Sequence, residues 1–437
     1  MNSTVILGAG LIGVSTAYYL SEHQIPSTIH LVDPSPELFS SASGFAGGFL
    51  AKDWFAPSSA SLGALSFDEH RKLAEQNDGR AKWGYTRSST FSHSHVPGTL
   101  EGGRGDDWLR TGQSRAQAVT AVAVESGDGN RPPWLRRVDG DDVQLISEEG
   151  TTGLVSVFLH PKRDPLRLCQ FLLQACLDRG VRLHHPAKAI SIRTDARREL
   201  GSIRIAETTS STETDLPCTH LLIAAGAWSP RVFAELFRHS SIRLPISSLA
   251  GHSLVFRPPL VSRDGGRQGD GQQPKESGDA EAVSYAVYST TRDGWSPELY
   301  SRLDGSIYIA GINSATEPLP PLPSDAVIDA EKIKRLKETA AQMVFFDQEG
   351  NESDLEVVRE GHCFRPISDT GVPVIARIAD ADLGIGVRTR PGAEGGVYVA
   401  AGHGPWGITL SLGTGKVMAE MVQGRPRSAD VSGLGLS

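Results

Sequence analysis

The chain begins with apolar residues and glycines in an order typical of a βαβ unit. Residues 5–7 form an apolar run that predicts a buried strand, and residues 11–20 carry apolar side chains at helical spacing. A glycine-rich turn at residues 8–13 lies between them, and a second apolar strand is predicted at 29–32. Two parallel strands joined by a helix are therefore expected at the start of the chain.

Further along, hydrophobic periodicity alternates with segments rich in glycine and charged residues. Residues 165–180 predict an amphipathic helix that ends at Gly180. Residues 263–280 contain almost no apolar side chains, so we expect a mobile loop there. The other predicted elements are helices at 62–76, 326–345 and the last part of 402–421, and strands at 181–183, 189–192, 221–224, 253–256, 284–288, 306–310 and 397–400.

The spacing of the first glycines predicts a dinucleotide site. Gly8 permits the tight turn, Gly10 lets the backbone approach a pyrophosphate, and Gly13 lets the helix pack closely on the strand. Asp33, after the second strand, can accept hydrogen bonds from an adenosine ribose and would repel a 2′-phosphate, which argues against NADP. A glycine turn in an ordinary βαβ unit is the alternative. The motif alone does not choose between NAD and FAD, but its position at the start of a long chain favours FAD.

The composition is that of a soluble globular enzyme. With 437 residues the chain exceeds a single core, so two domains are expected. A net charge of −8 gives no reason to expect nucleic-acid binding, no apolar run is long enough to span a membrane, and the first apolar run is not a signal peptide. The four cysteines form no CxxC pair and the thirteen histidines are scattered. We therefore expect reduced thiols, no metal site and a cytoplasmic protein.

Five segments, in the same order along the chain, resemble the D-amino-acid-oxidase-like (DAO) superfamily of FAD-dependent oxidoreductases, which includes glycine and sarcosine oxidases. These segments are Gly8 to Gly13, residues 42–48, residues 224–228, Arg365-Pro366 with residues 369–375, and residues 401–408. Residues 42–54 and 66–70 are most similar to a little-characterised eukaryotic branch of the superfamily.

The resemblance implies an α/β plus α+β architecture. A discontinuous, Rossmann-like FAD-binding domain would carry a substrate domain built on a mainly antiparallel sheet. We assign residues 1–58, 151–240 and 355–437 to the FAD-binding domain, and residues 59–150 and 241–354 to the substrate-binding domain. We expect a monomer or a weak homo-oligomer that takes a small-molecule amine and O2.

In that fold the glycine turn would face the pyrophosphate, Asp33 the ribose, and the strand near Lys188 the adenine. Residues 402–408 would place backbone N–H groups beside the pyrimidine end of the flavin, where a helix N-terminus stabilises negative charge. The cofactor-binding residues that the resemblance implies are Gly8, Ala9, Gly10, Leu11, Ile12, Gly13, Asp33, Pro34, Ala42, Ser43, Gly47, Gly48, Lys188, Ala225, Gly226, Trp228, Gly402, Gly404, Gly407 and Ile408.

Members of this superfamily oxidise a carbon–nitrogen bond. Hydride passes from the substrate α-carbon to flavin N5, O2 reoxidises the flavin to give H2O2, and the imine hydrolyses in water. Arg365 resembles the arginine that holds the substrate carboxylate in glycine oxidase, and a planar guanidinium suits that task. The alternatives are a structural arginine paired with an acid such as Asp369, or a flavin contact. Arg302 is a second candidate. A further arginine of glycine oxidase is replaced here by Pro405-Trp406, which permits a bulkier or less acidic amine.

Three other residues near the expected flavin each have two interpretations. His403 either steers protons and helps O2 reduction or fixes its own loop by a hydrogen bond. Trp406 either forms a wall of the substrate cavity or only packs. Cys363 lies in the region where sarcosine-oxidase relatives tether flavin, but its spacing to Asp369 differs from theirs. We therefore expect a free Cys363 thiol and non-covalent FAD.

The leading hypothesis is thus an FAD-dependent amine or amino acid oxidase. One alternative is a tailoring oxidase or dehydrogenase of a secondary metabolite, acting on a bulkier amine. Another is a flavin-binding protein of interaction or trafficking with weak or no catalysis. An NAD-dependent dehydrogenase is disfavoured, because residues 42–48 and 402–408 would have no role in one.

Overall fold

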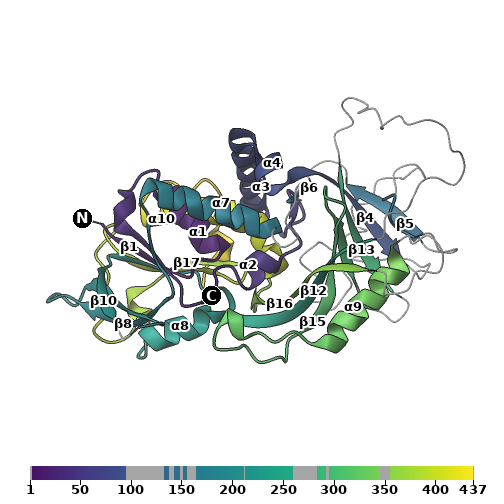
Figure 1. Cartoon of the computed structure of the whole chain (residues 1–437). Coiled ribbons are helices and arrows are strands. Elements are labelled where there is room, and N and C mark those ends of the chain that lie inside the picture. The colour runs from purple at the N-terminus through teal and green to yellow at the C-terminus, as the bar shows by residue number, and fades with distance from the viewer. Residues whose placement is uncertain are drawn as a thin grey trace, which may run out of the picture.

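The structure, a computed structural model, describes most of the chain. The described residues are 2–94, 132–136, 142–147, 151–154, 164–210, 212–258, 283–291, 295–344 and 355–436. The loop predicted at 263–280 lies outside the described residues. Two large sheets, each built from segments far apart in the sequence, lie side by side in the described part (Figure 1).

The first large sheet has six strands in the order β17-β18-β11-β1-β2-β7. Its strands are β1 (Thr4–Leu7), β2 (Ile29–Val32), β7 (Arg182–His184), β11 (His220–Ile223), β17 (Val374–Ile378) and β18 (Gly396–Ala401). Every pair is parallel except β17 with β18. The central strands are buried along their whole length, as expected of a parallel sheet that is covered on both faces.

Helices cover one face of the six-stranded sheet and a small sheet covers the other. Ile6 and Leu222 belong to the core formed with the helices, whereas Val5 and Leu221 belong to the core formed with the small sheet. This division follows from the alternation of side chains along a strand. The helices are α1 (Leu11–Leu20), α7 (Asp164–Arg179) and α10 (Gly407–Val422); the small antiparallel sheet is β8 (Ala187–Thr194), β9 (Leu200–Glu207) and β10 (Glu213–Pro217), beside α8 (Ser229–Leu236).

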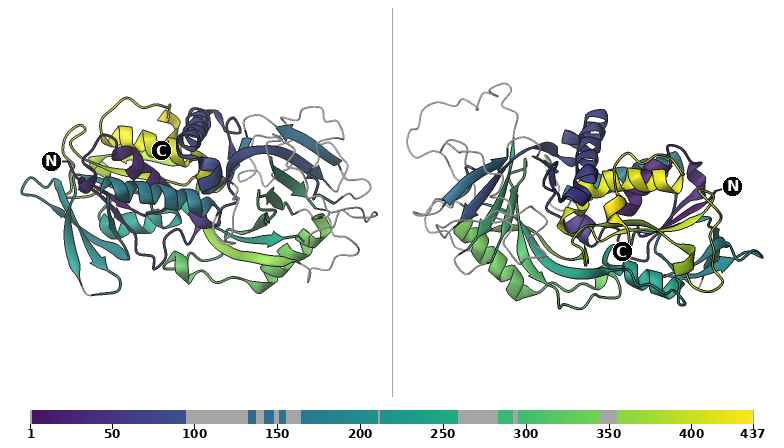
Figure 2. Two further views of the ribbon diagram at one scale, coloured as in Figure 1. Left: turned by 45° about the horizontal axis from the view of Figure 1, so that its top comes forward. Right: turned by 180° about the vertical axis from the view of Figure 1, so that it is seen from behind.

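The second large sheet has nine strands in the order β16-β12-β15-β14-β13-β4-β6-β3, with β5 also paired to β4. It is antiparallel except for the β4–β13 pair. One face packs against α9 (Ala330–Met343), which lies along the outside of the curved sheet (Figure 2). The strands are β3 (Phe49–Ala51), β4 (Tyr85–Ser94), β5 (Asp142–Ser147), β6 (Thr151–Leu154), β12 (Ile246–Arg257), β13 (Ser284–Thr290), β14 (Glu298–Ser301), β15 (Ile307–Ser314) and β16 (Glu356–Ser368).

The helix α3 follows β3 of the nine-stranded sheet and contacts the helices that cover the six-stranded sheet. The long helix α3 packs on α10, and Tyr19 on α1 donates a hydrogen bond of 2.8 Å to Glu69 on α3. The remaining helices are α2 (Ala42–Phe45), α3 (Pro57–Asn77), α4 (Gly79–Trp83) and the 3-10 helices η1 (Pro26–Thr28), η3 (Gly226–Trp228), η4 (Pro323–Asp325), η6 (Asp380–Asp382), η7 (Gly404–Trp406) and η8 (Ser432–Leu434).

The predicted fold class is confirmed: a mixed, mostly parallel sheet lies beside a mostly antiparallel one. The assignment of segments differs in places. The residues of β3, β6 and β16 fall in segments that we assigned to the FAD-binding domain, yet these strands pair in the nine-stranded sheet. The predicted helix at 326–345 begins only at Ala330, because the Asp329 side chain caps it by accepting hydrogen bonds from the next backbone N–H groups.

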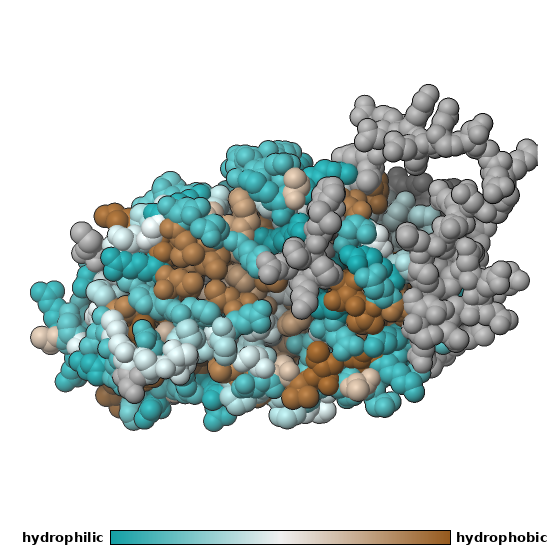
Figure 3. Space-filling view, viewed as in Figure 1, coloured by the Kyte–Doolittle hydropathy of each residue, from teal (hydrophilic) through white to brown (hydrophobic). Residues whose placement is uncertain are grey.

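None of the helices in the described part of the chain is long and apolar enough to cross a membrane. Among the same residues, no group of three or more histidine, cysteine, aspartate or glutamate side chains could hold a metal ion. The face seen in Figure 3 is largely hydrophilic, and its hydrophobic residues lie in separate patches.

Candidate active site

One cavity of about 470 Å³ lies between the two large sheets and is lined by residues of both. It contains most of the residues that the sequence predicts for the site. Those that line it are Gly8, Gly10, Leu11, Ile12, Asp33, Pro34, Ala42, Ser43, Gly47, Gly48, Lys188, Ala225, Gly226, Trp228, Arg365, His403, Gly404, Trp406, Gly407 and Ile408. Ala9, Gly13, Gly402 and Arg302 are not among its lining residues.

The glycine turn has the local geometry that its motif requires. Gly8 has φ +108° and donates its backbone N–H to Val32 O at 2.8 Å, which joins the turn to β2. A Cβ at Gly13 would lie 2.0 Å from Gly8 O, so Gly13 allows α1 to pack directly on the turn. A Cβ at Gly10 would meet nothing closer than Ser43 Oγ, at 3.3 Å. Gly10 is thus the position at which a ligand can approach the backbone.

Asp33 closes the turn from the other side. Its Oδ2 accepts the Ala9 N–H at 2.9 Å, and its Oδ1 accepts the Ser35 N–H at 2.9 Å. This contact explains why Ala9 is turned toward Asp33 and does not line the cavity. A carboxylate oxygen accepts more than one hydrogen bond, so Asp33 can still bind ribose hydroxyls from the cavity side.

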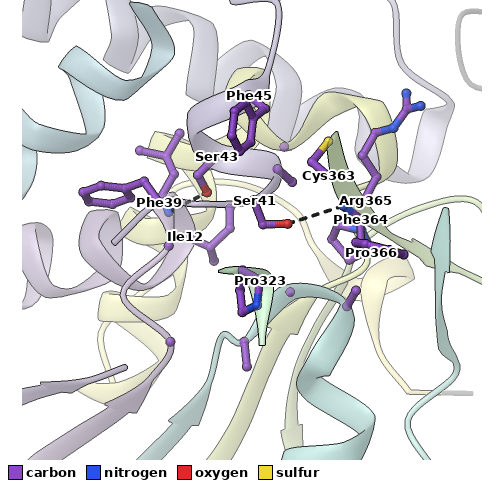
Figure 4. A pocket seen from close by; sticks show the side chains of 18 of the residues that line it. Ile12, Phe39, Ser41, Ser43, Phe45, Pro323, Cys363, Phe364, Arg365 and Pro366 are labelled. Carbon is purple, nitrogen blue, oxygen red and sulfur yellow. Dashed lines mark hydrogen bonds between the residues drawn. The ribbon is translucent and has the colours of Figure 1, made fainter. Parts of the chain in front are cut away.

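Residues 41–48, which include α2, lie between the two sheets, and most of them line the cavity. Ser43 Oγ accepts the Leu11 N–H at 3.0 Å, at the start of α1, and Ser41 Oγ accepts the Phe364 N–H of β16 at 3.4 Å (Figure 4). Arg359 of β16 donates to Gly44 O at 2.8 Å. These contacts hold residues 41–48 against both sheets, along the middle of the cavity.

The residues that line the cavity suit the separate parts of a dinucleotide. Lys188, whose ammonium pairs with Glu235 at 2.8 Å, follows Ala187, whose N–H donates to Asp33 O at 2.8 Å. The start of α1 at Gly10 and the start of α10 at Gly407 line the same cavity. Two helix N-termini facing one cavity provide positive dipole ends for a phosphate group and for a reduced ring.

Arg365 reaches the cavity from β16. Its guanidinium donates a hydrogen bond to Asn313 Oδ1 on β15, across Gly251 of β12. Cys363 extends from the same side of the strand (Figure 4). Burial raises the pKa of the Cys363 thiol, so the thiol form is favoured over the thiolate.

Arg302 lies in a different place. Its backbone forms the tight turn between β14 and β15, in which Arg302 N donates to Ser306 O at 2.8 Å. The side chain is buried there and does not line the cavity. The sequence suggested Arg302 because it precedes a turn at a strand end, and the side chain's direction is decided by the hairpin.

His403 and Trp406 both line the cavity, from the turn before α10. His403 Nε2 lies 3.0 Å from Thr414 Oγ1, inside α10, and burial lowers the pKa of His403 to about 3. A neutral ring held in this way favours the role of fixing its own loop. The Trp406 ring packs on Phe55, with centroids 5.1 Å apart, and on Trp54, at 6.2 Å.

The far wall of the cavity consists of residues that the sequence analysis did not single out: Tyr288, Glu298, Tyr300 and Tyr308. All four belong to neighbouring strands of the nine-stranded sheet. Strand alternation around the predicted strands at 284–288 and 306–310 could have identified two of them. Their approach to the cavity depends on strand pairing, which the pattern alone does not give.

The comparisons with known proteins agree over nearly the whole chain. Residues 3–421 match the DAO family, described as FAD dependent oxidoreductase. A Schizosaccharomyces pombe protein whose name assigns it to the oxidoreductases is 31% identical over 451 residues, covering 98% of this chain and 96% of that protein.

Two solved structures share the fold. Glycine oxidase from Geobacillus kaustophilus has a TM-score of 0.64 and 18% identity, covering 100% of this chain and 98% of its own. L-proline dehydrogenase from P. horikoshii has a TM-score of 0.64 and 13% identity, covering 99% and 96%. The arrangement of the glycine turn, residues 41–48 and the start of α10 around one cavity agrees with the match over residues 3–421, and this chain belongs to the DAO family of FAD-dependent oxidoreductases.

Proposed function

We propose that this protein oxidises the C–N bond of an amine or amino acid, passing hydride to flavin N5, using O2 as the final acceptor and releasing an imine. One observation carries the proposal. The cavity joins the start of α1 and the start of α10, which suit a flavin dinucleotide, to an arginine and an aromatic wall on the nine-stranded sheet. Bound FAD would supply the hydride acceptor, and the chain would supply binding and orientation.

The residues around the turn would hold the cofactor. The start of α1 at Gly10 would face the pyrophosphate, Asp33 the ribose, and residues 42–48 the flavin. Gly407 at the start of α10 would face the pyrimidine end of the ring. The raised pKa of the buried Cys363 thiol supports a non-covalent cofactor, because a thiolate is needed to form a thioether.

Arg365 would orient an acidic substrate. Asn313 is neutral, so this contact fixes the direction of the guanidinium without cancelling its charge. Pro405-Trp406 stands where glycine oxidase has a further arginine, so a substrate would rely on one arginine rather than two. This favours larger or less acidic amines than glycine, and it keeps the tailoring oxidase or dehydrogenase as the second candidate.

His403 would not move protons at this site. Its pKa is lowered to about 3 by burial and its Nε2 contacts Thr414, so the ring is neutral and engaged at ordinary pH. The substrate amine must therefore lose its proton before oxidation, and the reaction should accelerate as pH rises through the pKa of the substrate.

The first experiment is an absorption spectrum of the purified protein, with bands expected at about 370 and 450 nm for oxidised flavin. D-, L- and N-methyl amino acids and larger amines are then added without oxygen. Bleaching of the longer-wavelength band identifies the substrate class, and its return in air establishes an oxidase.

Other outcomes separate the alternatives. Bleaching that returns only with an added electron carrier indicates a dehydrogenase. A flavin that dithionite reduces but no amine reduces supports an interaction protein with weak or no catalysis. A protein that binds no flavin after reconstitution contradicts the proposal. Acid precipitation that leaves the yellow colour on the protein would contradict non-covalent binding.

A further inference from the structure

A cluster of three tyrosines and one glutamate forms the far wall of the cavity. Strand register places Tyr288 opposite Glu298 and Tyr300 opposite Tyr308. Side chains that alternate with these along the same strands pack on α9 instead; they are Val287, Leu299, Ile307 and Ile309. The wall is thus one face of the sheet, and its members share that face by register.

Phe49 of β3 completes the cluster. Its ring stacks on Tyr300, with centroids 5.9 Å apart and planes at 8°. Tyr300 in turn stacks on Tyr308, at 5.6 Å and 11°. Tyr288 stands nearly perpendicular to Tyr300, at 5.9 Å and 75°. Phe49, Tyr288, Tyr300, Tyr308 and Glu298, all lining the cavity, are called the aromatic–acid cluster below.

Glu298 brings a carboxylate into this aromatic wall. Glu298 is only 8% exposed, and the Tyr300 hydroxyl donates a hydrogen bond of 2.9 Å to Glu298 Oε2. Burial raises the pKa of the Tyr308 hydroxyl, so that ring stays neutral and presents its π-system unchanged. Aromatic faces and a buried carboxylate both attract cations, and both repel an anion at the same place.

The cluster borders the segment expected along the flavin. A Cβ at Gly47 would lie 2.3 Å from the Tyr300 ring and 3.0 Å from Tyr308. The backbone of Gly47 therefore packs directly against these two rings, with no side chain between them. A group held by the cluster would lie in the part of the cavity where the substrate must meet the cofactor.

We propose that the aromatic–acid cluster is a receptor for an ammonium group, and that the substrate carries a second, positively charged nitrogen besides the one that is oxidised. This proposal rests on the proposed function and names its substrate class. Hydride transfer from a C–N bond requires a neutral nitrogen with a free lone pair. A nitrogen held as a cation by Glu298 and the rings has none, so the group that is held and the group that is oxidised are different nitrogens.

The position of Arg365 relative to Glu298 agrees with a substrate that carries a carboxylate at one end and an ammonium group at the other. Its partner Asn313 lies three residues beyond Ala310 on β15, and Ala310 pairs with Glu298. Gly311 is an extra residue at a bulge, so the partners of Ala310 and Asn313 on β12, Ser253 and Gly251, are two residues apart, which is about 7 Å along a strand. A guanidinium and a carboxylate separated on this scale in one cavity fit an amino acid with an aliphatic ammonium side chain.

The experiment measures cation binding separately from oxidation. Tetramethylammonium, which offers no N–H group and no nitrogen lone pair, is titrated into the flavin-loaded protein, and 2,2-dimethylpropanol serves as a neutral ligand of similar shape. The readouts are tryptophan fluorescence, since Trp54 lies 5.8 Å from the Tyr288 ring, and the melting temperature. We expect the cation to bind at least about tenfold more tightly than the alcohol.

Matched variants test the named residues. Glu298→Gln should weaken tetramethylammonium binding at least about tenfold, whereas Glu356→Gln, at an exposed carboxylate on β16, should leave it unchanged. If Glu298→Gln does not fold, a second pair decides: Tyr308→Phe keeps the ring face and should retain binding, and Tyr308→Leu removes it and should lose binding.

The substrate comparison uses lysine and norleucine, each as D and L forms. Flavin reduction at limiting substrate should favour lysine at least about tenfold, and the preference should vanish in Glu298→Gln. Equal binding of the cation and the alcohol, or unchanged binding in Glu298→Gln, overturns the inference even if amines reduce the flavin. Cation binding without reduction by any amine keeps the receptor and refutes the proposed oxidation instead.

Discussion

Replacing Gly13 by alanine tests the packing of α1 on the glycine turn. The added methyl would lie 2.0 Å from Gly8 O and 3.2 Å from Ile6 Cγ2, so α1 must move by about 1 Å to reach an acceptable contact. Movement away from β1 is opposed on the other side, where Gly415 of α10 has space for no Cβ against Ser15. Such overpacking costs about 3 kcal/mol.

The assay is thermal unfolding of the protein before and after FAD is added. A loss of about 3 kcal/mol in stability lowers Tm by about 6–12 °C for a domain of about 150–250 residues. Gly10→Ala is the matched control, because its methyl meets only Ser43 Oγ at 3.3 Å. We expect Gly10→Ala to keep the Tm of the cofactor-free protein within about 2 °C and to lose FAD affinity instead.

The two variants separate packing from ligand approach. A Gly13→Ala protein that melts within about 2 °C of the wild type would refute the argument that this glycine serves close packing. A Gly10→Ala protein that binds FAD as tightly as the wild type would refute the argument that the ligand approaches the backbone there.

Three further changes should have distinct effects. The free energy of unfolding should fall as pH drops below about 6.5, because burial lowers the pKa of His403 to about 3 and unfolding then takes up a proton. The loss should reach up to about 1.4 kcal/mol per pH unit for each such histidine. Denaturation at pH 7, 6 and 5 measures this dependence, and His403→Gln should reduce its slope. Arg365→Gln should lower kcat/KM about 10- to 100-fold for amines with a carboxylate and leave other amines unaffected, as steady-state kinetics would reveal, whereas an equal loss for both kinds would indicate a structural arginine. Glu69→Ala removes a carboxylate that is 11% exposed and pairs with Lys416 at 2.8 Å, so denaturant unfolding should show a stability lower by about 2 kcal/mol. Glu75→Ala, at an exposed carboxylate on the same helix, should lower stability by about 0.5 kcal/mol or less. Equal losses of stability in the two variants would contradict the contact between Glu69 and Lys416.

The opening of the fold could be predicted with good boundaries. Strands predicted at 5–7 and 29–32 are Thr4–Leu7 and Ile29–Val32, and the helix predicted at 165–180 is Asp164–Arg179. These elements are buried on one face or on both, so their apolar spacing is strong and local. Gly180, with φ +99°, ends the helix as the sequence indicates.

β4 was not predicted, for a physical reason. Its ten residues are mostly hydroxyl-bearing, including the buried Ser88, Thr90 and Ser92, and an apolar alternation is missing. The strand exists because β13, β5 and β6 pair with it, and these contacts join residues that are far apart in sequence. Tertiary pairing therefore overrides a weak local pattern.

The sequence by itself determined the cofactor side of the cavity. Gly8 must adopt a positive φ, Gly13 must accept a helix at van der Waals distance, and Asp33 must follow the second strand, and each of these requirements is satisfied within about thirty residues of chain. Local conformational requirements of this kind leave a motif that can be recognised.

Only the tertiary structure decided the substrate side. Phe49 and Tyr300 stack although about 250 positions separate them, Arg365 meets Asn313 across β12, and the register of two short strands places Tyr288 opposite Glu298. A shift of one residue in that register would turn each of these side chains to the opposite face, toward α9. The composition of the substrate wall is thus a property of strand pairing, which no short segment of the sequence contains.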